Sequence, residues 1–194
     1  MVNYNRVLSE LGERAYPESR IREMIGEPLH DMYREALPRE KHNLVEHCFN
    51  RYIELFKQTA LWYTRLLDGV EDTVSYFASR GLRQSIATTK SAEETDIILT
   101  GLKVRQYFDL LLGVKDVVSP KPDPEIAYLT LQRLGIENDH AVIVGDTVID
   151  IETGKRSGIY TIAVTTGTHD RERLAGSNPD YIIDNIQELR DIVI

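Results

Sequence analysis

Two aspartates four residues apart follow a continuous apolar run. Asp146 and Asp150 lie in Gly145-Asp146-Thr147-Val148-Ile149-Asp150, directly after the apolar residues 141–144. Two carboxylates held close together in a cleft repel one another unless a cation compensates their charge. Mg²⁺ prefers hard oxygen ligands, takes few of them from the protein and completes its shell with water and substrate phosphate. The pair therefore indicates a magnesium site, although an aspartate at position 150 also suits the N-terminal cap of a helix.

A lysine enclosed by prolines is the second feature. Lys121 lies in Ser119-Pro120-Lys121-Pro122-Asp123-Pro124-Glu125, where prolines occupy alternate positions. Because proline fixes φ and restricts the residue before it, this pattern predicts a stiff, extended backbone that holds Lys121 in one direction. An ammonium group suits phosphate oxygens or a crowded set of carboxylates. The alternative is a rigid turn that carries a solvated lysine.

Hydroxyl groups end a predicted strand at Thr88-Thr89-Lys90. A hydroxyl at a strand end donates a hydrogen bond to a phosphate oxygen without adding charge. Threonine and serine also end strands simply as turn and cap residues, so Thr88 and Thr89 alone are weak evidence of a phosphate site.

The elements that must position these groups alternate between strands and helices. Helices are predicted over 70–79 and from about 92 to 99, and the five predicted strands are residues 84–88, 108–112, 141–145, 160–164 and 181–183. Such alternation predicts βαβ units and a parallel sheet, and the strand at 141–145 is apolar enough to be buried on both faces. In open α/β sheets the ligand lies at the carboxyl ends of the strands, where the three polar features occur.

The first third of the chain differs from the rest in the spacing of its apolar residues. Helical spacing of apolar residues continues from residue 1 to about 62, and no strand pattern occurs there. The sequence therefore predicts two domains, a helical module over residues 1–65 and an α/β core over 66–194.

Composition and charge argue against some classes of partner. Lys and Arg total 23 against 31 Asp and Glu, a net charge of −8, without the positive stripe that nucleic acid or anionic membranes require. No apolar run is long enough to span a bilayer, and the first residues lack a signal core. A single cysteine, Cys48, cannot form an internal disulfide. We expect a cytoplasmic protein with neither nucleic acid nor membrane as a partner, and a buried Cys48.

In their order along the chain, these motifs resemble those of the haloacid dehalogenase superfamily, in the branch of phosphoglycolate phosphatases with a helical cap. Thr88 matches the second motif of that family, Lys121 its third, and Asp146 with Asp150 its fourth. The resemblance implies a Rossmann-like core, a bound Mg²⁺, a small phosphorylated metabolite as substrate, and catalytic roles for Thr88 and Lys121. Further similar segments are 25–29, 68–70, 154–158 and 179–183.

The family's first motif, Asp-x-Asp-x-Thr, occurs nowhere in this sequence. In the family that motif ends the first core strand and supplies the nucleophile, the general acid and a metal ligand. The resemblance places that strand between the strands at 84–88 and 141–145, so we expect an α/β core without its first strand and an open slot there. Asp146 is then expected to hold Mg²⁺, Asp150 to share the metal site or orient Lys121, and Lys121 with Thr88 to bind phosphate.

Several explanations compete. Under the first, which we favour, the sequence is an incomplete copy of an ordinary phosphatase; under the second, it is a non-catalytic relative that binds a phosphorylated metabolite or a partner. Phosphomutase and phosphonate hydrolase activities within the family stay open, because the residues that distinguish them lie in the cap. A receiver-type signalling domain fits poorly, because receivers place their acidic pair at the beginning of the chain.

Overall fold

The computed structural model describes residues 2–24, 28–62 and 64–193, and the chain divides into two compact units, residues 1–64 and 65–194. Residues 25–27 of the predicted cap segment at 25–29 lie outside the described residues; Pro28 directly precedes a helix. No helix in the described ranges combines the length and apolarity needed to cross a membrane.

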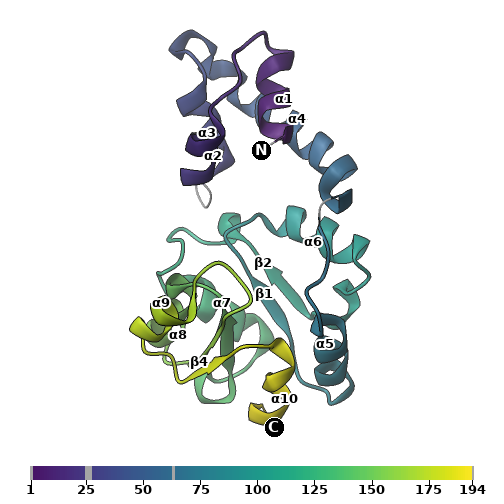
Figure 1. Cartoon of the computed structure of the whole chain (residues 1–194), viewed down its shortest axis with the longest axis vertical. Helices are drawn as coiled ribbons and strands as arrows, with labels where there is room; N and C mark the ends of the chain where they lie inside the picture. Colours follow the sequence, from purple (N-terminus) through teal and green to yellow (C-terminus); the bar gives the residue numbers. More distant parts are fainter. Residues whose placement is uncertain (1, 25–27, 63, 194) are drawn as a thin grey trace. The chain divides into compact units, whose positions relative to one another are not determined.

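The first unit is built from helices (Figure 1). Its elements are α1 (Val2–Glu10), α2 (Glu18–Glu23), α3 (Leu29–Ala36) and α4 (Val45–Thr59), with the 3-10 turns η1 (Arg39–Leu44) and η2 (Ala60–Trp62). Tyr4 stacks on Tyr33 with 4.5 Å between ring centroids, and both are buried with Cys48 in the core of this unit. Burial raises the pKa of the Cys48 thiol, as suits a residue that fills a core rather than a nucleophile.

The second unit alternates helices and strands. In chain order it contains α5 (Val70–Ser79), β1 (Ser85–Ala87), α6 (Ala92–Gly101), η3 (Arg105–Tyr107), β2 (Leu110–Leu112), η4 (Val114–Asp116), α7 (Glu125–Leu134), η5 (Asn138–His140), β3 (Val142–Gly145), α8 (Val148–Ser157), β4 (Tyr160–Val164), α9 (Arg171–Gly176), β5 (Tyr181–Ile183), η6 (Ile186–Glu188) and α10 (Leu189–Ile192). Every strand pair is parallel, which confirms the predicted α/β class.

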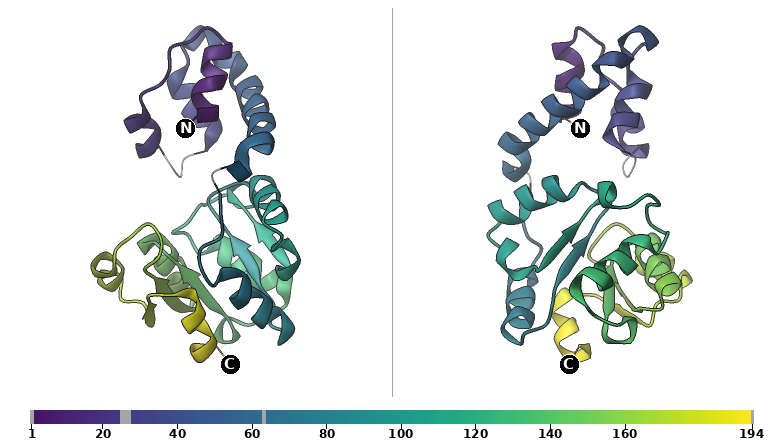
Figure 2. Two further views of the ribbon diagram at one scale, coloured as in Figure 1. Left: turned by 45° about the vertical axis from the view of Figure 1, so that its right-hand side comes forward. Right: turned by 180° about the vertical axis from the view of Figure 1, so that it is seen from behind.

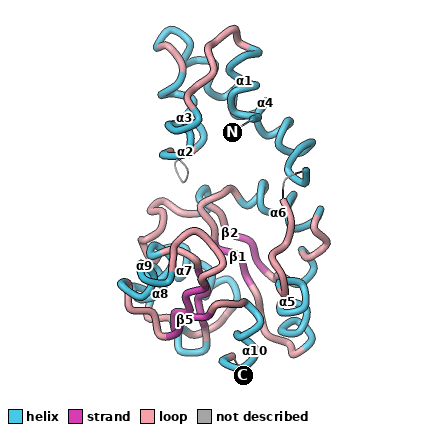
Figure 3. Tube along the Cα trace, viewed as in Figure 1, coloured by secondary structure: helices cyan, strands magenta, loops and turns pink. Residues whose placement is uncertain are grey.

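The strands form two separate sheets, as Figure 3 shows in magenta. One has the order β1-β2 and the other the order β3-β4-β5. Among the described residues β1 pairs only with β2, and β3 pairs only with β4, so each keeps one unpaired edge. This is the expected break between residues 84–88 and 141–145.

The degree to which a strand is buried depends on its place in the sheet. β4 is the central strand of its sheet and is buried from Thr161 to Val164. Side chains alternate along it: Ile162 and Val164 pack with residues of α5, β5 and α10, and Ala163 packs with Ile151 and Leu174 of α8 and α9. The prediction that the strand at 141–145 is buried on both faces is wrong: β3 is an edge strand, and Val142 is 36% exposed.

Helix α7 packs on the sheet formed by β1 and β2. α7 contacts both β1 and β2, and it also contacts α8 of the neighbouring layer (Figure 2). The carboxyl ends of β1 and β3 lead into α6 and α8. Thr88 directly follows β1 and Asp146 directly follows β3, so both residues lie in the turns that precede these helices.

Candidate phosphate and metal site

The acidic turn after β3 is held by a reciprocal helix cap. Thr147 is the N-cap of α8, and its hydroxyl oxygen accepts a hydrogen bond from the Asp150 amide at 3.3 Å. Asp150 Oδ2 in return accepts from the Thr147 amide at 3.2 Å and from the Thr147 hydroxyl at 2.6 Å. Asp150 is therefore the N3 residue of a capping box and not the N-cap that was considered for it, and its other oxygen points to a second partner.

That second partner is Lys121. Its Nζ donates to Asp150 Oδ1 at 2.7 Å and to the carbonyl oxygen of Ala87 at 2.8 Å. The side chains of Lys121 and Asp150 are only 7% and 16% exposed. An ammonium group has three N–H donors, so one donor of Lys121 remains for a further acceptor. The lysine thus connects the end of β1 to the start of α8 across the two unpaired edges.

The segment that carries Lys121 is a turn. The Asp123 amide donates to the carbonyl oxygen of Pro120 at 3.0 Å, which closes a tight turn at Lys121. The prediction of an extended backbone is therefore wrong, because stiff proline φ angles suit turns as well as extended chain. The Glu125 carboxylate accepts from the amides of Val118 and Ser119, and these bonds lower its pKa.

Thr88 follows β1 directly and lies beside the contact that Lys121 makes with Ala87. Its amide donates to the carbonyl of Leu112 on β2, and its Oγ1 accepts from the Lys90 amide at 3.1 Å. The hydroxyl proton is left for another acceptor. Thr89 is exposed, and its side chain makes no hydrogen bond within the described residues.

Ser91 caps α6 immediately afterwards, so the positive end of that helix dipole lies close to Thr88. The positive end of the α8 dipole likewise lies close to Asp146, because the N-cap Thr147 directly follows Asp146. Helix N-termini with free backbone donors favour anions such as phosphate. Thr88, Lys121 and the start of α8 are thus brought together as predicted, while Thr89 is the weakest member of the set.

Asp146 has one oxygen committed and one available. Its Oδ2 accepts from the Thr168 amide at 2.7 Å, and its main-chain oxygen accepts from the His169 amide at 3.1 Å. In the described part of the chain Oδ1 has no hydrogen-bond partner. A hard carboxylate oxygen beside a strand end fits Mg²⁺, which takes few protein ligands. Asp150 fits less well, since Lys121 and Thr147 occupy its two oxygens.

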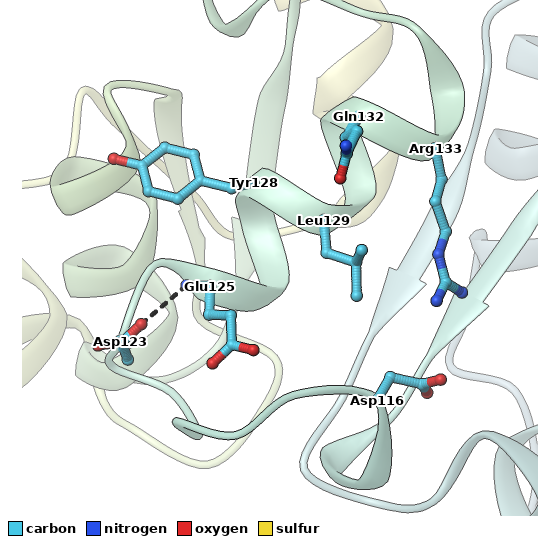
Figure 4. A pocket seen from close by; sticks show the side chains of 7 residues that line it. All are labelled: Asp116, Asp123, Glu125, Tyr128, Leu129, Gln132 and Arg133. Atoms are coloured by element: carbon cyan, nitrogen blue, oxygen red, sulfur yellow. Dashed lines mark hydrogen bonds between the residues drawn. The ribbon is translucent and has the colours of Figure 1, made fainter.

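The most evident surface pocket lies elsewhere (Figure 4). It has a volume of about 470 Å³ and lies against the first turns of α7. Its three carboxylates, those of Asp116, Asp123 and Glu125, each accept from a backbone amide of the same segment. Three acidic groups against the single cation Arg133 oppose the binding of a phosphate anion, so we place the phosphate site at the strand ends.

Sequence reasoning missed the turn Gly167-Thr168-His169. It follows β4, the neighbour of β3, and contacts the acidic turn through three hydrogen bonds. The rule that ligands lie at the carboxyl ends of parallel strands applies to β4 as well and would have drawn attention to this segment.

The family model for haloacid dehalogenase-like hydrolases matches residues 1–164 of this chain. The chain belongs to this family. That result confirms the resemblance inferred from Thr88, Lys121 and the Asp146–Asp150 pair.

Curated relatives agree with this assignment. The probable phosphatase IndB of Dickeya dadantii (strain 3937) is 31% identical over 173 residues, which cover 87% of this chain and 75% of that protein. The phosphoglycolate phosphatase of Salmonella typhimurium (strain LT2) is 31% identical over 170 residues, which cover 87% of this chain and 65% of that enzyme. The chain thus spans about two thirds of the length of the phosphoglycolate phosphatases that it matches.

Solved structures show the same fold. A predicted phosphoglycolate phosphatase from Haemophilus somnus 129PT superposes with a TM-score of 0.79 at 19% identity, covering 100% of this chain and 89% of that one. A haloacid dehalogenase-like hydrolase from Streptococcus pneumoniae gives a TM-score of 0.72 at 23% identity, covering 98% of this chain and 88% of that one.

Proposed function

We propose that this chain carries the phosphate- and metal-binding half of a Mg²⁺-dependent phosphatase that hydrolyses a small phosphate monoester through a phospho-aspartyl intermediate. The observation that carries the proposal is the position of Lys121, which reaches both the carbonyl end of β1 and Asp150 at the start of α8. One cation at that place neutralises charge on a phosphoryl group while its own carboxylate partner keeps it aligned.

Each residue has a distinct part in this proposal. Asp146 would hold Mg²⁺ through Oδ1, and the bound metal would neutralise charge at the phosphate oxygens. Lys121 gives its third N–H to a phosphate oxygen, and Thr88 donates its hydroxyl proton to another. Asp150 orients Lys121 and closes the cap of α8. Thr89 is a peripheral donor at most, because its side chain is exposed.

The nucleophile is missing from this arrangement. The sequence contains no Asp-x-Asp, the motif that ends the first core strand in the family. Phosphoryl transfer through a covalent intermediate needs such a carboxylate as acceptor. We therefore infer that the chain binds Mg²⁺ and phosphate as it stands and turns over only when a strand bearing that motif completes the site. If the protein is instead a non-catalytic relative, binding of Mg²⁺ and phosphate is its whole function and no turnover follows.

Relatives named phosphoglycolate phosphatases support a small phosphate ester as the proposed substrate class, as does the proposed site for one phosphate group. A small phosphorylated metabolite of the cytoplasm fits this proposal, and a net charge of −8 argues against nucleic acid as a partner. Phosphomutase and phosphonate hydrolase chemistry would use the same phosphate-binding groups.

Binding of inorganic phosphate tests the proposal. Titration calorimetry in the presence of Mg²⁺ should show phosphate binding to the wild-type chain and weaker binding to Lys121→Met, by roughly 1–3 kcal/mol for the loss of a charge-assisted contact. Lys103→Met, which removes an exposed lysine of the same unit, should bind as the wild type does. Equal phosphate affinity of the wild type and Lys121→Met would show that Lys121 has only a structural role.

A further inference from the structure

The turn after β4 lies against the acidic turn after β3. β3 and β4 are neighbours in register, with Gly145 opposite Ala163, so the segments that follow them meet at the same edge of the sheet. Thr168 donates its amide to Asp146 Oδ2, and His169 donates its amide to the main-chain oxygen of Asp146. A single short turn therefore fixes both the side chain and the backbone of Asp146.

Gly167 allows this close approach. A Cβ at position 167 would lie 2.2 Å from Asp146 Oδ2 and 2.3 Å from Asp146 Cβ, closer than van der Waals contact permits. The two turns are thus in direct contact, and any side chain larger than hydrogen at this position would displace Asp146.

The imidazole of His169 makes the third connection. Its Nδ1 accepts a hydrogen bond from the Val148 amide at 3.1 Å. Val148 is the first residue of α8, and its amide is one of the four N–H groups that a helix cannot satisfy by itself. Since Nδ1 accepts, the ring proton is on Nε2 in the neutral imidazole. His169 therefore binds the acidic turn on both sides of Thr147, at Asp146 and at Val148.

We propose that His169 is a positioning residue for the metal ligand: its imidazole, bound to the Val148 amide, holds the turn in place, so that the amides of Thr168 and His169 stay on Asp146 and Oδ1 is the oxygen presented to a divalent cation. This inference rests on the proposed function, because it takes Asp146 as the ligand. Carboxylate ligands are commonly oriented by hydrogen bonds from surrounding groups, and loss of such a partner lowers metal affinity on the order of 10-fold or more.

Two substitutions at one position test the proposal. His169→Asn keeps an acceptor, because the amide Oδ1 of asparagine can take the place of imidazole Nδ1, whereas His169→Leu removes it. Mn²⁺ affinity, measured by water-proton relaxation on the whole chain, should fall about 10-fold in His169→Leu and stay within about threefold of wild type in His169→Asn. Hydrogen exchange of the Val148 amide should accelerate in His169→Leu only. Melting temperatures of both variants show whether each is folded.

The outcomes separate the inference from the proposed function. Equal Mn²⁺ affinity of the wild type and a folded His169→Leu would overturn the positioning role and leave the metal site intact. A wild-type chain that binds no Mn²⁺ would overturn the proposed function itself. If His169→Leu does not fold, His169→Asn decides: a 10-fold loss there, with Val148 still protected, would show that acceptance at Nδ1 is not what positions Asp146.

Discussion

At the scale of single residues, Gly145 sets how closely the acidic turn can fold onto its own helix. A Cβ built on Gly145 would lie 2.2 Å from Asp150 Cβ and 2.6 Å from Asp150 Cγ. Asp150 is the partner of Lys121 and the closing member of the cap of α8. The absence of a side chain at one position therefore permits both the cap and the ion pair.

We expect Gly145→Ala to lower the free energy of unfolding by roughly 1–3 kcal/mol, the usual cost of forcing extra volume into a packed site. Asp150 would have to move, which would weaken its contact with Lys121. Gly176→Ala is the matched control, since a Cβ there meets nothing within 4 Å. It should change stability by less than about 1 kcal/mol. Urea denaturation of both variants measures the difference, and equal stabilities would show that the acidic turn adapts without cost.

Residue types and spacing predicted that Lys121, Thr88 and Asp150 share a site, and the contact between Lys121 and Asp150 is present. Each of these residues comes from a segment that follows a parallel strand, Lys121 from the long loop after β2, and the sheet rule brings such segments to one edge. The contact between His169 and Val148 was not predictable in the same way. It joins residues 21 positions apart and depends on β3 and β4 being neighbours, which strand patterns alone do not specify.

At the scale of elements, the loop that presents Lys121 is stabilised by the first residue of α7. Glu125 accepts hydrogen bonds from the amides of Val118 and Ser119, and these two bonds hold its pKa below its ordinary value. A carboxyl whose pKa is lowered on folding stabilises the folded state above its unfolded pKa. That contribution is lost as pH falls through the lowered value.

Glu125→Gln should therefore lower the melting temperature at neutral pH. Its deficit relative to wild type should shrink as pH falls from the ordinary glutamate pKa through the lowered pKa of Glu125, because the wild-type carboxyl then becomes neutral too. Glu172→Gln makes the same charge change in the first turn of α9, where, within the described residues, no backbone amide donates to the carboxylate. It should show little change at either pH. A deficit for Glu125→Gln that persists unchanged in acid would assign the effect to something other than its charge.

Element positions were more predictable than their burial. The strands at 160–164 and 181–183 have the predicted bounds, while the one expected over 108–112 is limited to Leu110–Leu112. Apolar content suggested that the strand at 141–145 was buried on both faces, yet β3 is a partly exposed edge strand and β4 is the central one of its sheet. A partly exposed edge strand can carry the same apolar run as a central one, so strand order has to come from the structure.

At the scale of the whole α/β unit, the dominant feature is the unpaired edges of β1 and β3. Within the described residues no backbone pairing links β1 to β3, and the side chain of Lys121 connects Ala87 of β1 to Asp150 of α8 at this point. Unpaired strand edges are templates for pairing with another chain. The break was predictable from the missing first motif, because the family's strand order places the absent strand there.

The central proposal is that this chain holds phosphate- and metal-binding groups and lacks the strand that carries the nucleophile, the general acid and a further metal ligand. The most direct measurement compares three proteins on p-nitrophenyl phosphate with Mg²⁺: the 194-residue chain, the chain extended at its N-terminus by an apolar strand ending in Asp-x-Asp-x-Thr, and the same extension with asparagine for the first aspartate. Sedimentation of the three proteins shows whether the extension also prevents self-association.

We expect Mg²⁺-dependent release of p-nitrophenol from the extended chain alone, because only that protein offers both the binding groups and a carboxylate that can accept the phosphoryl group. Both extended proteins should sediment as monomers, since both fill the slot between β1 and β3. Activity of the 194-residue chain by itself, or equal activity of the aspartate and asparagine extensions, would contradict the account.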